Sequence, residues 1–113
     1  MEKFKIIGPS RLVGEVSISG AKNAALPIFC ASLLTSEPVQ IFNVPDLKDV
    51  STMFALLRKL GVGILVDKRG NFCEIEANSI SSVEAPYDLV KTMRASILVL
   101  GPLLAKHGEA KVS

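Results

Sequence analysis

The sequence predicts an α/β fold built from alternating strands and helices. The predicted order over residues 12–77 is strand, helix, strand, helix, strand, strand. Apolar residues make up 49% of the 113 residues, which is enough for the core of one small domain. A shift of 70 residues also sets Ala25 on Ala95 and Ile28 on Leu98, in two apolar helices that are each followed by a polar break. These observations indicate one βαβαββ unit and the start of a second.

The first strand and the first helix flank a glycine. Residues 12–19 alternate apolar and polar side chains, which is typical of a half-buried strand, and Gly20 ends it. Residues 21–34 then form a helix-like segment, with Pro27 in its early part. Because this segment has almost no polar face after its start, we expect it to be buried on all sides.

The second strand, the second helix and a hairpin follow. Residues 39–44 predict a strand, and residues 49–60 carry apolar side chains at i, i+3, i+4 and i+7, the pattern of an amphipathic helix. Residues 62–66 predict another strand. Residues 67–71 predict a hairpin connection, and residues 72–77 the returning strand.

The last third of the chain begins the second unit. Residues 78–86 are expected to form a loop, and a single third helix is predicted from Asp88 to Lys106, ending at His107-Gly108. Residues 110–112 predict the start of a final strand, for which the sequence indicates no partner. The chain therefore looks like a segment that stops within its second unit.

Composition and charge exclude several classes of protein. The net charge is +2 and the basic residues are scattered, whereas a nucleic-acid-binding domain would show a basic stripe. The longest apolar stretch, residues 95–105, is shorter than the roughly 18–20 residues of a membrane span. The amino terminus lacks the apolar core of a signal peptide. Cys30 and Cys73 lie in apolar stretches without metal-ligand spacing, which indicates buried, reduced thiols in a cytoplasmic protein.

The junction of Gly20 with the first helix is the sharpest candidate site. Lys22 and Asn23 open that helix, where backbone N–H groups and the helix dipole favour an anion. A lysine is unfavourable there for the helix itself, because its charge opposes the helix dipole. Residues that are locally unfavourable in this way are expected at functional sites. The alternative is that Lys22 extends to solvent and Asn23 is only an N-cap.

Arg94 is the second candidate. It precedes the apolar run of the third predicted helix and falls within a residue or two of Lys22 under the 70-residue shift. Two cations at equivalent ends of repeated helices would converge on one cleft, and arginine suits phosphate or carboxylate. The alternative is an ordinary surface salt bridge, with Asp88 nearby.

The other polar residues indicate less. His107 is interpreted as a cation at a helix end. Asp46, Asp49, Glu74 and Glu76 are interpreted as helix caps and solvated strand faces. The sequence has no nucleophile–base pair, metal-ligand cluster or glycine-rich phosphate loop.

Four collinear motifs resemble a known family. They are GAKNAALP from Gly20, NVPDLKDV from Asn43, LLRKLGV from Leu56 and APYDLVKTMRASI from Ala85. Together they resemble the amino-terminal part of the UDP-N-acetylglucosamine 1-carboxyvinyltransferases, a branch of the enolpyruvyl transferase family. The sister branch, which acts on shikimate 3-phosphate, has a serine-containing motif where this chain has Lys22-Asn23-Ala24-Ala25.

The resemblance implies an activity and a fold. The family transfers enolpyruvyl from phosphoenolpyruvate to the 3-hydroxyl of UDP-N-acetylglucosamine, the first committed step of peptidoglycan synthesis, without a metal or organic cofactor. Its fold is an inside-out α/β barrel of repeated units, with the helices inside and the sheets outside. By resemblance, Lys22 and Asn23 contact phosphoenolpyruvate and Arg94 contacts the UDP-sugar. Residues 1–20 are expected to pack with another, absent domain, and residues 21–113 to form part of the first enolpyruvyl transferase domain.

The resemblance also marks what this chain does not contain. In the family, a mobile loop with a general-acid cysteine or aspartate follows the segment that ends here at Ser113, so no catalytic acid is expected among these residues. Position 98 is leucine, where some relatives carry an aromatic residue. The expected partners are therefore small-molecule substrates and the rest of the enzyme chain. Two alternatives stay open, namely the shikimate 3-phosphate transferase and a non-catalytic anion-binding module.

Overall fold

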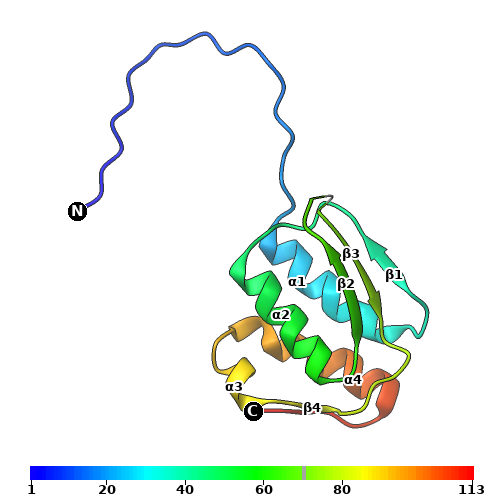
Figure 1. The fold of residues 1–113 in the computed structure, drawn as a ribbon. Helices are drawn as coiled ribbons and strands as arrows, with labels where there is room; N and C mark the ends of the chain where they lie inside the picture. Colours follow the sequence, from blue (N-terminus) through cyan, green and yellow to red (C-terminus); the bar gives the residue numbers. More distant parts are fainter. Residues whose placement is uncertain (70) are drawn as a thin grey trace.

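The computed structural model describes residues 1–69 and 71–113 and has mixed α/β architecture (Figure 1). Helices α1, α2, α3 and α4 and the 3₁₀ helices η1 and η2 lie together, and a three-stranded sheet runs along one side of them. In chain order the elements are α1 (Lys22–Ala31), η1 (Ser32–Leu34), β1 (Val39–Ile41), α2 (Lys48–Lys59), β2 (Gly63–Asp67), β3 (Phe72–Glu76), β4 (Glu84–Ala85), α3 (Tyr87–Val90), η2 (Arg94–Val99), α4 (Leu100–His107) and β5 (Lys111–Val112).

The three-stranded sheet has the order β1-β3-β2, and both pairings are antiparallel. Ile75 on the central strand is opposite Val39 on one side and Ile64 on the other, so one face of the sheet is apolar and turned to the core. The strands predicted at residues 39–44, 62–66 and 72–77 are thereby confirmed. The predicted hairpin connection includes position 70, which lies outside the described residues.

Helices α1 and α2 build the core beside this sheet. The apolar stripe predicted for the second helix is confirmed, because Val50, Met53 and Leu57 are all buried. The rings of Phe29 on α1 and Phe54 on α2 are 4.8 Å apart between centroids, in a tilted pair. Within the described residues, no helix combines the length and the apolar character needed to cross a bilayer.

The expectation that the first helix is buried on all sides is wrong. One face of α1 packs into the core, where Phe29 is fully buried, but Ile28 on the opposite face remains 50% exposed. No described residue covers that second face fully. The side chains of the helix are apolar all round, yet the neighbouring elements of this chain cover only part of its circumference.

The single third helix predicted from Asp88 to Lys106 is also wrong, because the structure divides it into α3, η2 and α4. Met93 is extended, with φ −149° and ψ 115°, and Thr92 Oγ1 donates a hydrogen bond to the Leu89 carbonyl at 2.8 Å, so the chain leaves the helical path there. Further on, Pro102 has no N–H to donate to the carbonyl four residues back, and the run before it is 3₁₀. The break places Arg94 at the start of a helical segment.

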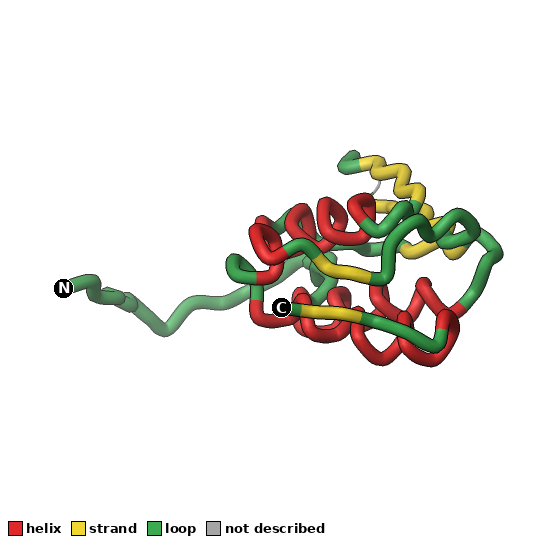
Figure 2. The backbone as a smooth tube through the Cα atoms, turned by 90° about the horizontal axis from the view of Figure 1, so that it is seen from below, coloured by secondary structure: helices red, strands yellow, loops and turns green. Residues whose placement is uncertain are grey.

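The predicted final strand is confirmed as β5, and its partner is β4. The two short strands are parallel, with Glu84 opposite Lys111, and they run beside each other away from the three-stranded sheet (Figure 2). The prediction of a plain loop over residues 78–86 was wrong at this point. A two-residue strand is too short to show periodicity in the sequence.

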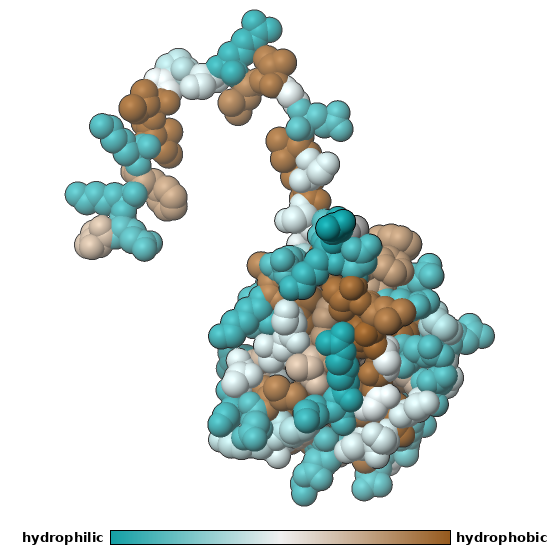
Figure 3. Space-filling view, viewed as in Figure 1, coloured by the Kyte–Doolittle hydropathy of each residue, from teal (hydrophilic) through white to brown (hydrophobic). Residues whose placement is uncertain are grey.

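Residues 1–20 form an extended arm that leaves the body of the molecule (Figure 1). The strand predicted over residues 12–19 does not form in the described chain, because a strand needs a neighbour to pair its backbone groups. Apolar side chains of the arm stand away from the body (Figure 3), and Phe4 is 98% exposed. The radius of gyration is 17.4 Å, against about 13 Å for a compact domain of 100 residues.

Both cysteines are buried free thiols, and we predict that stability falls as the pH rises above 9. Burial raises the pKa of Cys30 to about 12 and that of Cys73 to about 11, from an ordinary 9.0. In the unfolded chain the thiols ionise from pH 9 upward, whereas the folded chain keeps them neutral. Their contribution to stability is therefore complete below pH 9 and is lost between pH 9 and about 11–12. Urea unfolding at pH 8, 9, 10 and 11 would measure this loss.

The control for this prediction is a variant with both cysteines replaced by alanine. Other groups also titrate at alkaline pH. The informative quantity is therefore the difference between the two proteins in the slope of unfolding free energy against pH. The variant should lose less stability over this range than the parent chain. Equal slopes would contradict the assignment of the loss to the two thiols.

Candidate functional site

The three residues predicted to form a site line one pocket at the meeting point of α1, α2 and η2. Lys22 and Asn23 are the first two residues of α1, and Arg94 is the first residue of η2. The cavity has a volume of about 430 Å³ and is open to solvent. Its lining divides into a polar group and an apolar wall: Lys22, Asn23, Asp49, Thr92 and Arg94 form the first, and Leu26, Met93, Ala95, Ile97 and Leu98 form the second.

A close backbone contact sets the position of Lys22. Gly20 passes so near the loop before α2 that a Cβ atom there would collide with the carbonyl oxygen of Asn43. A Cβ atom at position 20 would also lie 3.1 Å from Cδ of Pro45. Glycine is therefore required at this junction, and the close approach holds the start of α1 beside the residues that lead into α2.

The amino terminus of α1 is cationic and lacks a side-chain cap. Its N-cap is Ala21, so the alternative interpretation of Asn23 as the N-cap is wrong, and no side chain among the described residues caps this helix end. The first backbone N–H groups of the helix consequently keep their hydrogen-bonding capacity, and the dipole adds a partial positive charge. With Lys22 and Arg94 on the same pocket, this arrangement suits an anionic ligand.

The ammonium of Lys22 lies 3.0 Å from Oδ2 of Asp49, in the first turn of α2. Asp49 was interpreted from the sequence as a cap or a solvated acid, so its place in the pocket was missed. The sequence carried only an indirect signal, because a lysine at a helix N-terminus needs a nearby anion to offset the dipole. Lys22 therefore does not simply extend into solvent, although its side chain is 44% exposed.

The predicted alternative for Arg94, a salt bridge to Asp88, is not formed. Asp88 is instead 3.7 Å from the ammonium of Lys91 on the same helical turn. Arg94 makes no ion pair with a carboxylate of the described residues. Its guanidinium, with five N–H donors, is therefore available to a ligand in the pocket.

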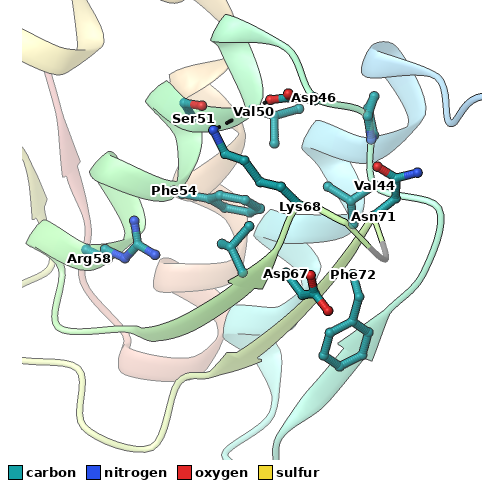
Figure 4. Close-up of a pocket in the computed structure, with 12 residues that line it drawn as sticks. Val44, Asp46, Val50, Ser51, Phe54, Arg58, Asp67, Lys68, Asn71 and Phe72 are labelled. Carbon is teal, nitrogen blue, oxygen red and sulfur yellow. Dashed lines mark ion pairs between the residues drawn. The ribbon is translucent and has the colours of Figure 1, made fainter.

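A second pocket, of about 280 Å³, lies between α2 and the β2–β3 strands (Figure 4). Its cations already have partners within the chain, since Lys68 is 3.9 Å from Asp46, and Arg58 Nη2 donates to the Ile64 carbonyl at 3.1 Å. None of the sequence-predicted site residues lines it. In the pocket of Lys22 and Arg94, by contrast, Arg94 has no carboxylate partner among the described residues, and the uncapped start of α1 adds backbone N–H donors. That pocket is therefore the better candidate for binding an anion.

Comparison with known proteins gives concordant matches. A family model described as EPSP synthase (3-phosphoshikimate 1-carboxyvinyltransferase) matches residues 6–113. UDP-N-acetylglucosamine 1-carboxyvinyltransferase of Hydrogenovibrio crunogenus (strain DSM 25203 / XCL-2) is 58% identical over all 113 residues, and the chain spans 27% of the length of that relative. The enolpyruvyl transferase NikO from Streptomyces tendae matches with a TM-score of 0.77 and 29% identity, over 91% of this chain and 24% of that one. The fold is thus of the enolpyruvyl transferase type.

Proposed function

This chain belongs to the EPSP synthase family, and from that premise we propose that it forms part of an enzyme that transfers enolpyruvyl from phosphoenolpyruvate to the 3-hydroxyl of UDP-N-acetylglucosamine. The observation that carries the proposal is one pocket with a lysine and an arginine at two helix starts, in a chain 58% identical to a UDP-N-acetylglucosamine 1-carboxyvinyltransferase. The chain spans 27% of that relative, so the proposal concerns the full-length protein.

The reaction proceeds by addition and elimination. In the addition, a proton is added to C3 of phosphoenolpyruvate, and the 3-hydroxyl oxygen of the sugar forms a bond to C2 and gives up its proton. In the elimination, the bond from C2 to the phosphate oxygen breaks, C3 loses a proton, and phosphate leaves. The donors and acceptors of these protons are proposed to lie outside this chain, as is the loop acid of the family.

Lys22 and Asn23 are proposed to contact phosphoenolpyruvate, and Arg94 the UDP-sugar. A preorganised cation stabilises negative charge that develops on a phosphorylated substrate, and does so more strongly in a partly enclosed site than in water. The amide of Asn23 supplies donors and an acceptor beside the ammonium of Lys22. Leu98 lines the same pocket as Arg94.

The domain assignment and the setting are part of the same proposal. Residues 1–20 are proposed to pack with another domain of the enzyme, which would cover the exposed apolar side chains of the arm, and residues 21–113 to form part of the first domain. The enzyme would act in the cytoplasm in peptidoglycan synthesis, and so in cell-wall formation, cell shape, the cell cycle and cell division. Its partners would be its two small-molecule substrates and the rest of its chain, with no nucleic acid, membrane or cofactor.

A substrate comparison tests this function. We predict that the full-length protein releases phosphate from phosphoenolpyruvate when UDP-N-acetylglucosamine is present and not when shikimate 3-phosphate replaces it. The shikimate alternative has one supporting observation, the match of residues 6–113 to a family model described as EPSP synthase. Phosphate release from phosphoenolpyruvate with shikimate 3-phosphate as the acceptor, and not with UDP-N-acetylglucosamine, would establish that alternative. If phosphate is released with neither UDP-N-acetylglucosamine nor shikimate 3-phosphate as the acceptor, the result would favour a non-catalytic anion-binding module. We expect the 113-residue polypeptide by itself to show no turnover.

A further inference from the structure

The pocket contains one acid whose place the proposed reaction does not explain. Asp49 faces a site whose other charged groups are the cations Lys22 and Arg94. A carboxylate opposes the binding of an anionic substrate, so its presence on the lining needs a compensating role. Its described partner is the ammonium of Lys22, 3.0 Å away.

Capping of α2 does not account for Asp49. The N-cap of α2 is Leu47, and no side chain among the described residues makes a capping hydrogen bond there. The carboxylate lies in the first turn of α2, where the helix dipole stabilises it as an anion and the helix backbone fixes its position. It is therefore a negative charge on the backbone of α2 whose ion pair is with the first residue of a different helix, α1.

Lys22 is in the opposite situation. Its ammonium sits at the positive end of α1, on the same pocket as the guanidinium of Arg94, and both features repel it from the site. A lysine side chain is also long and flexible. Without a fixed anion, the ammonium would spend more of its time away from the pocket. The contact with Asp49 offsets the repulsion and restricts the side chain.

We infer that Asp49 is a positioning residue, which holds the ammonium of Lys22 in the pocket for the anionic group of the substrate. An ammonium has three N–H donors, so one can remain on Asp49 while the other two reach a phosphate or carboxylate oxygen. The contribution of Asp49 is then expected in kcat, through the placement of the Lys22 ammonium during the reaction, rather than in a lower KM. The inference rests on the proposed function.

The kinetic test is Asp49→Asn in the full-length protein. We expect kcat to fall about tenfold, because the ammonium is no longer held toward the developing charge. The KM for phosphoenolpyruvate should not rise, because the substitution also removes a negative charge that repels the substrate. Asp49→Glu, which keeps the carboxylate, should recover kcat to within about threefold of the parent protein.

Asp46→Asn is the matched control. Asp46 precedes the same helix and also pairs with a lysine, but it lines the other pocket (Figure 4). Its kinetic constants should stay within about twofold of the parent values. A kcat for Asp49→Asn equal to that of Asp46→Asn would overturn the inference.

A double-mutant cycle separates positioning from a general structural role. In a Lys22→Ala background, Asp49→Asn should no longer lower kcat/KM, because Asp49 then has nothing to position. If Asp49→Asn lowers kcat/KM equally with and without Lys22, Asp49 does not act through the lysine, and the inference fails.

A second readout does not depend on turnover. Labelling of Lys22 by trinitrobenzenesulfonate, followed by peptide mass spectrometry, should be at least about threefold faster in Asp49→Asn than in the parent protein, because the paired amine is held. Asp46→Asn should leave the rate at Lys22 unchanged. An unchanged rate in Asp49→Asn overturns the inference. If Lys22 is labelled faster in Asp49→Asn than in the parent protein, but the parent protein transfers no enolpyruvyl, the proposed function is contradicted and the Lys22–Asp49 pairing is still established.

Discussion

Replacing Lys22 with alanine in the full-length protein is expected to lower kcat/KM for phosphoenolpyruvate by about 30- to 1,000-fold, which corresponds to about 2–4 kcal/mol of lost transition-state stabilisation. The ammonium is the cation at the start of α1, on the pocket that the proposed substrate would enter. Steady-state measurement of phosphate release, with UDP-N-acetylglucosamine at saturation, determines the loss.

Lys68→Ala is the control for this loss. Lys68 also pairs with an aspartate, but it lines the pocket between α2 and the β2–β3 strands. Its removal should leave kcat/KM within about twofold of the parent value, since exposed ion pairs contribute little. An unchanged kcat/KM in Lys22→Ala, or an equal loss in both variants, would contradict the assignment of Lys22 to the site.

The largest effect on stability is expected from Phe29→Ala in the 113-residue chain, at about 3–5 kcal/mol. Phe29 is fully buried, and its ring contacts that of Phe54 where α1 meets α2. The substitution removes buried apolar surface and leaves a cavity that the surrounding helices can only partly fill. Urea unfolding followed by far-ultraviolet circular dichroism measures the change.

The neighbouring residue gives a matched control for the core. Ile28 lies on the same helix but is 50% exposed, so Ile28→Ala should cost about 1 kcal/mol or less. A cost for Phe29→Ala no larger than that for Ile28→Ala would show that the Phe29–Phe54 contact does not anchor α1 on α2.

The regular elements of the fold were predictable because their sequence patterns are local. The apolar stripe of α2 and the alternation around Ile75 report directly which side of each element is buried. The third predicted helix failed because an extended residue at Met93 and the proline at position 102 override its apolar composition. The strand predicted over residues 12–19 failed because a strand depends on a neighbour, which the described chain does not supply.

The site was predictable in part for a related reason. Lys22 broke a local rule of helix electrostatics, and Arg94 followed from the repeat, so both were visible along the chain and do meet in one pocket. Asp49 was not, because its contact with Lys22 joins residues from two helices and leaves no spacing signal. The same holds for Thr92 and Met93, which line the pocket at the point where the helical path is interrupted.

The most direct test of the account is a crystal structure of the full-length protein with phosphoenolpyruvate and UDP-N-acetylglucosamine bound. We expect a phosphoenolpyruvate oxygen within about 3.2 Å of the Lys22 ammonium, and an oxygen of the UDP-sugar within hydrogen-bonding distance of the Arg94 guanidinium. Phosphoenolpyruvate bound away from Lys22, for example beside Lys68 and Arg58 in the pocket of Figure 4, would contradict it.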